Sequence, residues 1–151
     1  MPPNPPKPPR PQKAKTPVKA MTPRARLGRG GESLAATWLG AHGYRVIERN
    51  WRCPYGELDL IAQDDTGTLI GVEVKTRRGT AMGAPEEAIT PVKRRRLLTT
   101  LQLYVQEWME RQGPATSEPA YRLDVVAIQL APEGALREIR HYPYAIALDD
   151  C

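Results

Sequence analysis

Two neighbouring stretches, Gly56–Gln63 (GELDLIAQ) and Thr68–Thr76 (TLIGVEVKT), are separated by the short sequence DDTG. The first alternates strictly, so that Leu58, Leu60 and Ala62 fall on one face of an extended strand. The second is rich in β-branched and aliphatic residues, and DDTG is typical of a turn. Together they predict a β-hairpin, around which the rest of the domain is organised.

The charged residues of this hairpin are confined to one face of each strand. Glu57 and Asp59 share a face of the first strand, and Glu73 and Lys75 share a face of the second. A three-residue loop with Gly67 at a positive φ angle would place Asp59 opposite Glu73 and Glu57 opposite Lys75. A two-residue turn would break this pairing.

Two carboxylates that face each other on a sheet repel, so their placement requires a cation. Lys75 could supply one, but a divalent metal does so better, and Asp and Glu oxygens suit Mg²⁺ or Mn²⁺. Such a metal polarises a phosphodiester and activates water, while Lys75 would position that water or stabilise charge on the phosphate. Asp59, Glu73 and Lys75 are therefore candidate catalytic residues. In an unrelated protein, the same pattern would more often be a solvated sheet face.

Further elements are predicted on both sides of the hairpin. Thr90-Pro91 gives a helix N-cap followed by proline at the first helical position, and Gly113-Pro114 ends that helix. Because this helix connects two strands in the manner of a crossover, we expect an α/β fold with a mixed β-sheet flanked by helices, in the order α-β-β-β-α-β-β. The other predicted elements are a helix at 29–41, strands at 44–51 and 121–130, an edge strand at 135–141 and a glycine-containing loop at 77–84.

The basic charge of the chain is unevenly distributed. The 151 residues carry a net charge of +5, but residues 1–30 contain eight basic residues and no acidic one, which leaves the remaining 121 residues at −3. Nine of the 16 prolines lie in the first 23 residues, so residues 1–27 are expected to form a disordered, extended leader. That leader is either an inert tail or a non-specific nucleic-acid arm, and residues 28–148 form the folded domain.

Several classes of protein are excluded. The chain has no apolar run long enough for a membrane span and no secretory h-region, which predicts a cytoplasmic protein with no membrane partner. Its histidines and two cysteines lack the spacing of a zinc site. No phosphate-binding loop, dinucleotide fingerprint or nucleophile elbow occurs in a plausible context.

The motifs resemble a known family. Asp59 followed by Glu73-Val74-Lys75, after a helix that carries Glu32, resembles the PD-(D/E)XK core of restriction-endonuclease-like proteins. The wider pattern over about residues 28–146 resembles the YraN family of uncharacterised bacterial proteins and, beyond it, archaeal Holliday-junction resolvases. It is carried by the following segments: Gly31-Glu32, Gly43-Tyr44, Arg49-Asn50, GELDLIA at 56–62, VEVK at 72–75 with Arg77, Lys93, and RLDVV at 122–126. Leu58 stands where the superfamily label has proline.

The resemblance implies a role for each residue of the motif. Asp59 and Glu73 correspond to metal ligands, the backbone carbonyl of Val74 to a further ligand, Lys75 to the catalytic lysine and Glu32 to the acid of the first helix. Glu32 equally suits the first turn of a helix, where an acid is favoured by the helix dipole. Glu57 would contact Lys75 or the waters of the metal, or it is only a polar strand residue.

Basic residues near the hairpin could contact a phosphate backbone. We expect Arg77, Arg78, Lys93 and Arg94 to bind nucleic acid, although the run at 93–96 spans every face of a helical turn and solvated charge remains the alternative. A second charged pair, Arg122 and Asp124, shares a strand face and is expected to be a structural ion pair.

The sequence therefore predicts a Mg²⁺- or Mn²⁺-dependent endonuclease that hydrolyses DNA phosphodiester bonds, with branched or structured DNA as a candidate substrate. Cutting a junction needs two symmetric incisions, so a resolvase-like activity would imply a homodimer. The alternative is a nucleic-acid-binding or DNA-processing accessory protein that has the nuclease fold and does not cleave. A direct salt bridge of Lys75 without metal affinity would favour that alternative.

Overall fold

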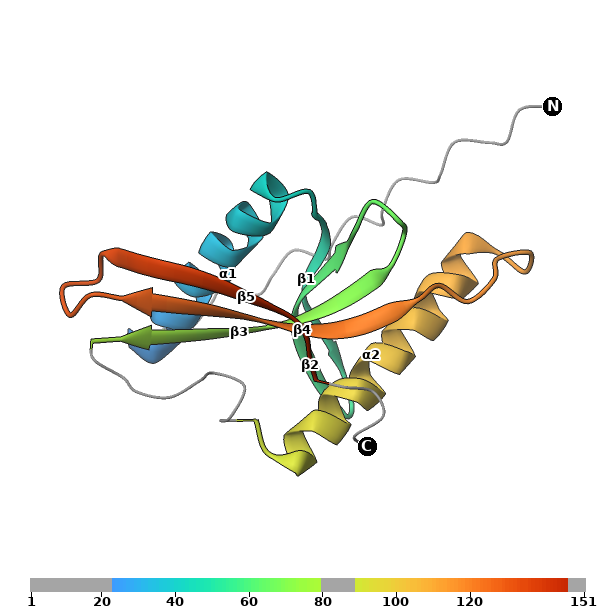
Figure 1. Cartoon of the computed structure of the whole chain (residues 1–151). Helices are drawn as coiled ribbons and strands as arrows, with labels where there is room; N and C mark the ends of the chain where they lie inside the picture. The colour runs from blue at the N-terminus through green and yellow to red at the C-terminus, as the bar shows by residue number, and fades with distance from the viewer. Residues whose placement is uncertain (1–22, 80–88, 147–151) are drawn as a thin grey trace, which may run out of the picture.

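The structure, a computed structural model, describes residues 23–79 and 89–146 (Figure 1). Two helices and a five-stranded sheet follow one another in the predicted order α-β-β-β-α-β-β, and the strands lie in the order β1-β2-β3-β4-β5. The parallel pair β3 and β4 is joined by α2, which confirms the crossover and the mixed sheet. The elements are α1 (Pro23–Ala41), β1 (Arg45–Cys53), β2 (Gly56–Gln63), β3 (Leu69–Arg78), α2 (Pro91–Gln112), β4 (Tyr121–Leu130) and β5 (Leu136–Ile146).

The hairpin register matches the prediction. Leu60 pairs with Val72 and Gln63 with Leu69, as predicted, but the pairing of β2 with β3 ends at Leu60. The expected cross-strand pairs Asp59–Glu73 and Glu57–Lys75 lie beyond this end and do not form, and Glu57 pairs with Arg52 of β1 instead. Gly67 has φ +87°, as the three-residue loop requires. The carboxylate of Asp64 closes this loop by accepting hydrogen bonds from the backbone N–H groups of Thr66 and Thr68, both at 3.0 Å.

Helix α2 begins where its sequence predicts. The hydroxyl of Thr90 accepts a hydrogen bond from the backbone N–H of Lys93 at 3.2 Å, and Pro91 occupies the first helical position. Gly113 ends the helix with φ +106°. The stripe of α2 that faces the sheet is buried at Leu97, Thr100, Leu101, Tyr104 and Val105.

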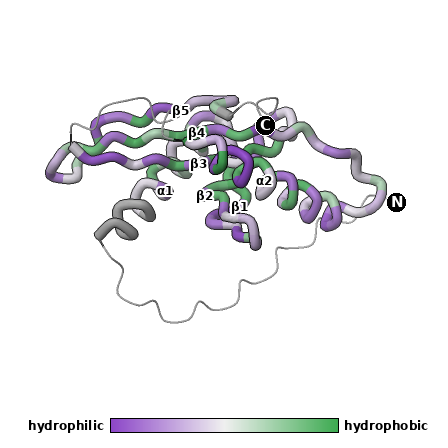
Figure 2. Tube along the Cα trace, turned by 90° about the horizontal axis from the view of Figure 1, so that it is seen from below, coloured by the Kyte–Doolittle hydropathy of each residue, from purple (hydrophilic) through white to green (hydrophobic). Residues whose placement is uncertain are grey.

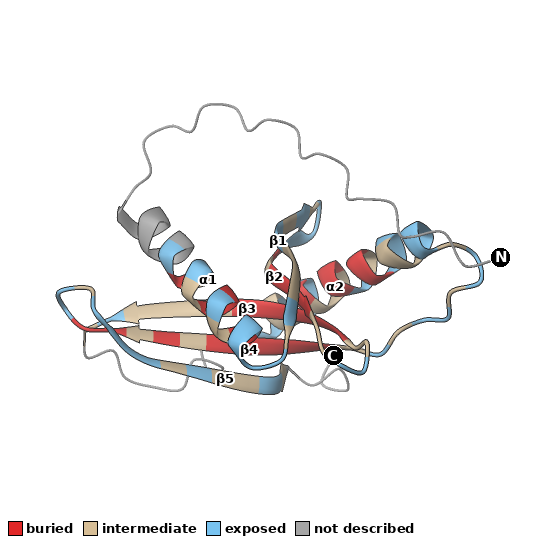
Figure 3. Cartoon of the chain, turned by 90° about the horizontal axis from the view of Figure 1, so that it is seen from above, coloured by how far each residue is buried: buried red, intermediate tan, exposed pale blue. Residues whose placement is uncertain are grey.

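Two apolar clusters lie on opposite faces of the sheet. One packs α2 against Leu58, Ile61 and Leu69, and the other packs α1 against Leu60, Ala62 and Val72, so each hairpin strand contributes to both. Figure 2 shows apolar residues along the inner strands, and Figure 3 shows burial concentrated in β3, β4 and the inner side of α2. No helix among the described residues is long and apolar enough to cross a membrane.

Four expectations about element boundaries are corrected. Helix α1 begins at Pro23 and not near residue 29, because proline is compatible with the first turn of a helix, so residues 23–27 belong to α1; residues 1–22 lie outside the described residues. Strand β1 continues through Asn50, which has φ +51°, to Cys53. Arg77 and Arg78 belong to β3 because their pairing with β4 continues past the end of β2, and residues 80–84 of the expected loop lie outside the described residues. Strand β5 extends to Ile146, five residues beyond the predicted end.

The strict alternation expected for β2 is also wrong at one residue. Leu58 packs with Ile61 in the cluster under α2, whereas Leu60 and Ala62 pack under α1. Strand β2 pairs with β3 only from Leu60 onward, while its first half pairs with β1 alone. A two-stranded ribbon twists more strongly than a wide sheet, which turns Leu58 to the other side.

Gly31 determines how closely α1 approaches the sheet. A Cβ atom on Gly31 would stand 1.9 Å from Oγ1 of Thr76 in β3, whereas a Cβ on Gly30 would meet no atom within 4 Å. Helix and strand can therefore approach this closely only because residue 31 has no side chain.

We expect Gly31→Ala to lower the free energy of unfolding by about 1–3 kcal/mol, because the added methyl overpacks the contact with Thr76. Gly30→Ala is the matched control and should raise stability by about 0.5–1 kcal/mol, since alanine is the better helix former. Urea unfolding followed by circular dichroism measures both. Adding Thr76→Ala should recover most of the loss; equal stabilisation by the two single variants would contradict the close packing.

Candidate active site

The site lies where β2 and β3 separate. The two strands pair as far as Leu60 and Val72, and beyond this point β3 continues to pair only with β4, on its other side. The backbone N–H of Val74 thus has no partner strand, and the Asp59 carboxylate accepts its hydrogen bond at 2.8 Å. In an extended strand the N–H and C=O of one residue point to the same side, so the Val74 carbonyl is directed toward Asp59 as well.

Glu73 lies beside Asp59 and is paired with two lysines. Its Oε1 atom is 3.2 Å from Nζ of Lys75 in the same strand and 2.7 Å from Nζ of Lys93 in α2. Glu73 is only 8% exposed, and the lysines compensate the cost of burying its charge.

The electrostatics of the site favour a neutral Asp59 in the absence of a bound cation. Burial, followed by the negative charge of Glu73, raises the pKa of Asp59 from 3.8 to about 7, with smaller effects in the same direction from Glu32 and Glu57. The hydrogen bond from Val74 opposes this shift. A carboxyl group with so high a pKa beside a second carboxylate is the environment in which an added divalent cation is favourable.

The two lysines are perturbed in opposite directions. Burial, followed by the hydrogen bond with Lys93 and reinforced by its positive charge, lowers the pKa of Lys75 against the opposing attraction of Glu73. Burial also opposes the charge of Lys93, but its pKa is raised because its interactions with Glu73, Lys75 and Asp59 outweigh that effect. A lysine with a depressed pKa is suited to hold or exchange a proton.

A pocket of about 320 Å³ opens beside these residues. Glu57, Asp59 and Glu73 line one part of it, and α2 provides Lys93 and Arg96. The remaining lining residues are Tyr55, Gly56, Thr90, Val92, Leu97 and Thr100.

The other acids expected at the site are placed differently. Glu57 lines the pocket but forms its salt bridge with Arg52 of β1, at 2.9 Å, and not with Lys75. Glu32 is half-buried in α1, where its charge raises the pKa of Asp59. The structure thus brings together Asp59, Glu73 and Lys75, with Glu32 and Glu57 close enough to act on Asp59 electrostatically.

The expected nucleic-acid-binding residues separate into two groups. Lys93 lines the pocket, and Arg77 follows Lys75 on the same face of β3. Arg78 instead lies against the β4–β5 turn, where its Nη2 atom would be 3.0 Å from a Cβ on Gly134. Arg94 has a buried Nε atom and does not line the pocket, because it lies one residue along α2 from Lys93.

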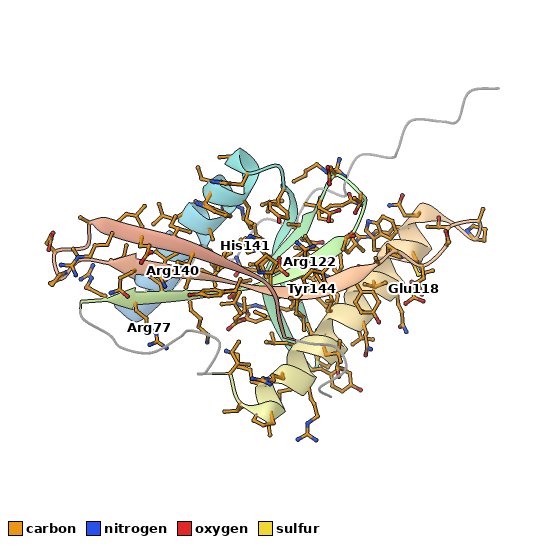
Figure 4. All side chains as sticks on the ribbon, viewed as in Figure 1. Arg77, Glu118, Arg122, Arg140, His141 and Tyr144 are labelled. Atoms are coloured by element: carbon orange, nitrogen blue, oxygen red, sulfur yellow. The ribbon has the colours of Figure 1, made fainter. Side chains whose placement is uncertain are left out.

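The expected ion pair in β4 is part of a larger network. Nε of Arg122 is 3.0 Å from Oδ1 of Asp124, which confirms the pair. The Asp124 carboxylate also contacts Nε2 of His141 at 2.7 Å and accepts a hydrogen bond from the backbone N–H of Tyr144 at 3.0 Å. Arg122 lies under the Tyr144 ring, 4.8 Å from its centroid, and Figure 4 shows Arg122, His141 and Tyr144 close together where β4 pairs with β5. This network fastens the edge strand β5 to the sheet.

Some pocket residues were not identified from the sequence. Arg96 belongs to the basic run and lies one helical turn from Lys93, a spacing in the sequence that identifies it as a neighbour of Lys93 on α2. Tyr55 follows Pro54 in a turn, and this pattern predicts that the tyrosine is exposed but does not indicate a function for it. Tyr55 and Arg96 line the same pocket only because the β1–β2 turn packs against α2, and a contact between such distant segments cannot be predicted from local patterns.

The donor set fits a magnesium-like ion. Among the described residues, no three His, Cys, Asp or Glu side chains converge on one point. Mg²⁺ and Mn²⁺, however, are usually held by one or two carboxylates together with water and substrate phosphate oxygens. Asp59, Glu73 and the Val74 carbonyl are oxygen donors of this kind, and an ion held by them would keep its remaining positions for water and substrate.

Stability of the metal-free protein should fall as pH rises from about 4 to 7. In this window Asp59 is ionised in the unfolded chain but protonated in the fold, so its contribution declines by about 1.4 kcal/mol per pH unit and is absent above pH 7. Chemical denaturation of the wild type and of Asp59→Asn across this range measures the difference. The two pH profiles should diverge by this slope; parallel profiles would show that the Asp59 pKa is not raised.

Comparisons with known proteins identify the family of the chain. Residues 31–128 match the uncharacterised protein family UPF0102. The UPF0102 protein of Symbiobacterium thermophilum is 49% identical over 112 residues, covering 74% of this chain and 89% of the relative. That of Roseiflexus castenholzii is 41% identical over 82% of this chain and 94% of the relative, and that of Mycobacterium tuberculosis 42% identical over 83% and 95%.

Solved structures show more distant similarity. A repair endonuclease from Pyrococcus abyssi is 17% identical with a TM-score of 0.31, over 83% of this chain and 42% of the endonuclease. Pyrococcus furiosus SfsA in complex with Ca²⁺ is 17% identical with a TM-score of 0.37, over 78% of this chain and 62% of SfsA. The match over residues 31–128 and the 49% identity to the relative from Symbiobacterium thermophilum show that this chain belongs to the UPF0102 family, also called YraN.

Proposed function

We propose that this protein is a Mg²⁺- or Mn²⁺-dependent endonuclease that hydrolyses DNA phosphodiester bonds, with branched or structured DNA as its substrate. The observation that carries the proposal is the partly buried Asp59 beside the buried Glu73, with Lys75 at 3.2 Å from Glu73, at the point where the sheet opens. A sheet that needed only stability would not place two neighbouring carboxylates, one of them buried, at its fork. The resemblance to the PD-(D/E)XK core assigns the same three residues.

Each residue has a defined task in this proposal. Asp59, Glu73 and the Val74 carbonyl hold the metal, which when bound polarises the phosphodiester and lowers the pKa of its water. Lys75 positions the attacking water and stabilises negative charge on the phosphate as a P–O ester bond breaks. Lys93 and Arg77 offer positive charge to neighbouring phosphates. Two such sites in a homodimer would serve a substrate that requires paired incisions.

Incubation of the full chain with branched, single-stranded and duplex DNA in Mg²⁺ or Mn²⁺ tests the activity. Cleavage should occur and should fall by at least about a hundredfold in Asp59→Asn and Lys75→Ala, because each loses an interaction with the reacting phosphate or its metal. Glu138→Gln in β5 is a control carboxylate, exposed and paired with Arg140, and should cleave normally. Cleavage that survives Asp59→Asn would rule out this site.

A second candidate function is favoured by the salt bridge between Lys75 and Glu73. With Lys93 on the same oxygen, Glu73 is neutralised without a metal, as expected for a protein that binds DNA and does not cleave it. The two functions differ in metal affinity, because only the endonuclease requires the lysines to give way to a divalent cation. Titration with Mn²⁺ therefore discriminates between them.

Lys93→Ala should tighten Mn²⁺ binding about two- to fivefold, because it removes a competing cation whose half-exposed ion pair is worth about 1 kcal/mol or less. Calorimetric titration of the metal into the DNA-free protein measures this. Arg95→Ala removes an exposed cation from the same turn of α2 and should leave the affinity unchanged. Equal affinities for the wild type and Lys93→Ala would mean that Lys93 does not compete with the metal.

A further inference from the structure

The pocket beside the acids has lining residues that the proposed hydrolysis does not use. Besides Glu57, Asp59 and Glu73, it is lined by the β1–β2 turn and by the first turns of α2. A Cβ on Gly56 would stand 3.2 Å from Oγ1 of Thr100, so this turn packs closely against α2. The contact brings Tyr55 of the turn and Val92 of the helix to the same pocket.

Tyr55 and Val92 are unusually exposed. Among the described residues, four large hydrophobic side chains are exposed, and two of them line this one pocket: Tyr55 at 60% and Val92 at 52%. Of the other two, Tyr144 covers Arg122 and so has a partner within the fold. Apolar and aromatic surface gathered at a pocket is characteristic of a ligand site.

Positive charge lies next to this apolar surface. Lys93 and Arg96 line the pocket from positions one helical turn apart, so they share a face of α2. A ligand with a flat aromatic part and a phosphate would match the tyrosine and the two cations together. At about 320 Å³ the pocket is at the lower end of the range for small-molecule sites, which suits one such unit.

We propose that this pocket holds one unpaired nucleotide, with its base stacked on Tyr55 beside Val92 and its phosphate near Lys93 and Arg96. A base inside a duplex has both faces covered by its neighbours, and only an unpaired base offers a free face to an aromatic side chain. Since the acids line the same pocket, this inference rests on the proposed function and deepens it: the substrate has a single-stranded segment next to the scissile phosphate.

The test measures DNA binding without cleavage, in EDTA, by fluorescence anisotropy of a short labelled oligothymidylate and of a labelled duplex of the same length. Tyr55→Ala should weaken single-strand binding by about 5- to 150-fold, the effect of losing one base–aromatic stack, and leave duplex binding unchanged. Tyr55→Phe should bind like the wild type, because the ring is retained. The salt dependence should be the same for all three proteins, because no phosphate contact is lost.

Tyr144→Ala is the matched control, since it removes a similarly exposed tyrosine that does not line the pocket. Circular dichroism confirms that each variant is folded. A Tyr55→Ala protein that binds the single strand as the wild type does, or that loses single-strand and duplex binding equally, would overturn the proposal. The outcome is separate from the nuclease test. If Tyr55→Ala loses single-strand binding but the wild type does not cleave DNA, the nucleotide pocket is supported and the proposed nuclease activity is not. If the wild type cleaves DNA but Tyr55→Ala binds the single strand normally, the nuclease activity is supported and the nucleotide pocket is not.

Discussion

The hydrogen bond from the Val74 N–H to the Asp59 carboxylate is the contact on which the site depends. A strand that loses its neighbour exposes backbone donors and acceptors, and in a half-buried position these need partners. Here a side chain from the departing strand provides one. The sheet can therefore open without leaving that donor unpaired, and the opening gives Asp59, Glu73 and the Val74 carbonyl a common space that a continuous sheet would fill.

Burial of this space has an electrostatic consequence. Water is partly excluded, so Asp59 is shifted toward its protonated form and Glu73 recruits ammonium groups from β3 and α2. Lys75 comes from the same strand as Glu73, but Lys93 reaches the site only because the Thr90 cap starts α2 at this position. The N-cap of α2, a local sequence feature, therefore determines where the positive charge of Lys93 lies relative to Glu73, which belongs to a distant segment.

Much of the fold follows from local patterns. The loop with Gly67 set the hairpin register, and Thr90-Pro91 set the start of α2, because in both places the backbone geometry is dictated by a few adjacent residues. The acid pair followed from the register. Its burial, which raises the pKa of Asp59, could not be predicted because it depends on packing between segments far apart in the chain.

The features that local patterns did not predict also depend on how distant segments pack and twist together. The pattern of β2 placed Leu58 with Leu60, but alternation assumes a flat strand, and the free ribbon of β1 and β2 twists. Arg77 and Arg78 are adjacent in the sequence but lie on opposite faces of β3, because neighbours in a strand point to opposite faces. The ion pair of Arg122 and Asp124 was predicted from its spacing in one strand, while His141 and Tyr144 join it through the pairing of β4 with β5.

The missing side chain at Gly31 has a mechanical consequence for its neighbour. Glu32 follows it in α1 and acts electrostatically on Asp59, so the height at which the helix rests on Thr76 also sets how near that carboxylate comes to the fork. Because glycine has no side chain, it allows the shortest distance between α1 and β3 at this contact. The size of the residue at position 31, which carries no charge, therefore influences the acidity of Asp59.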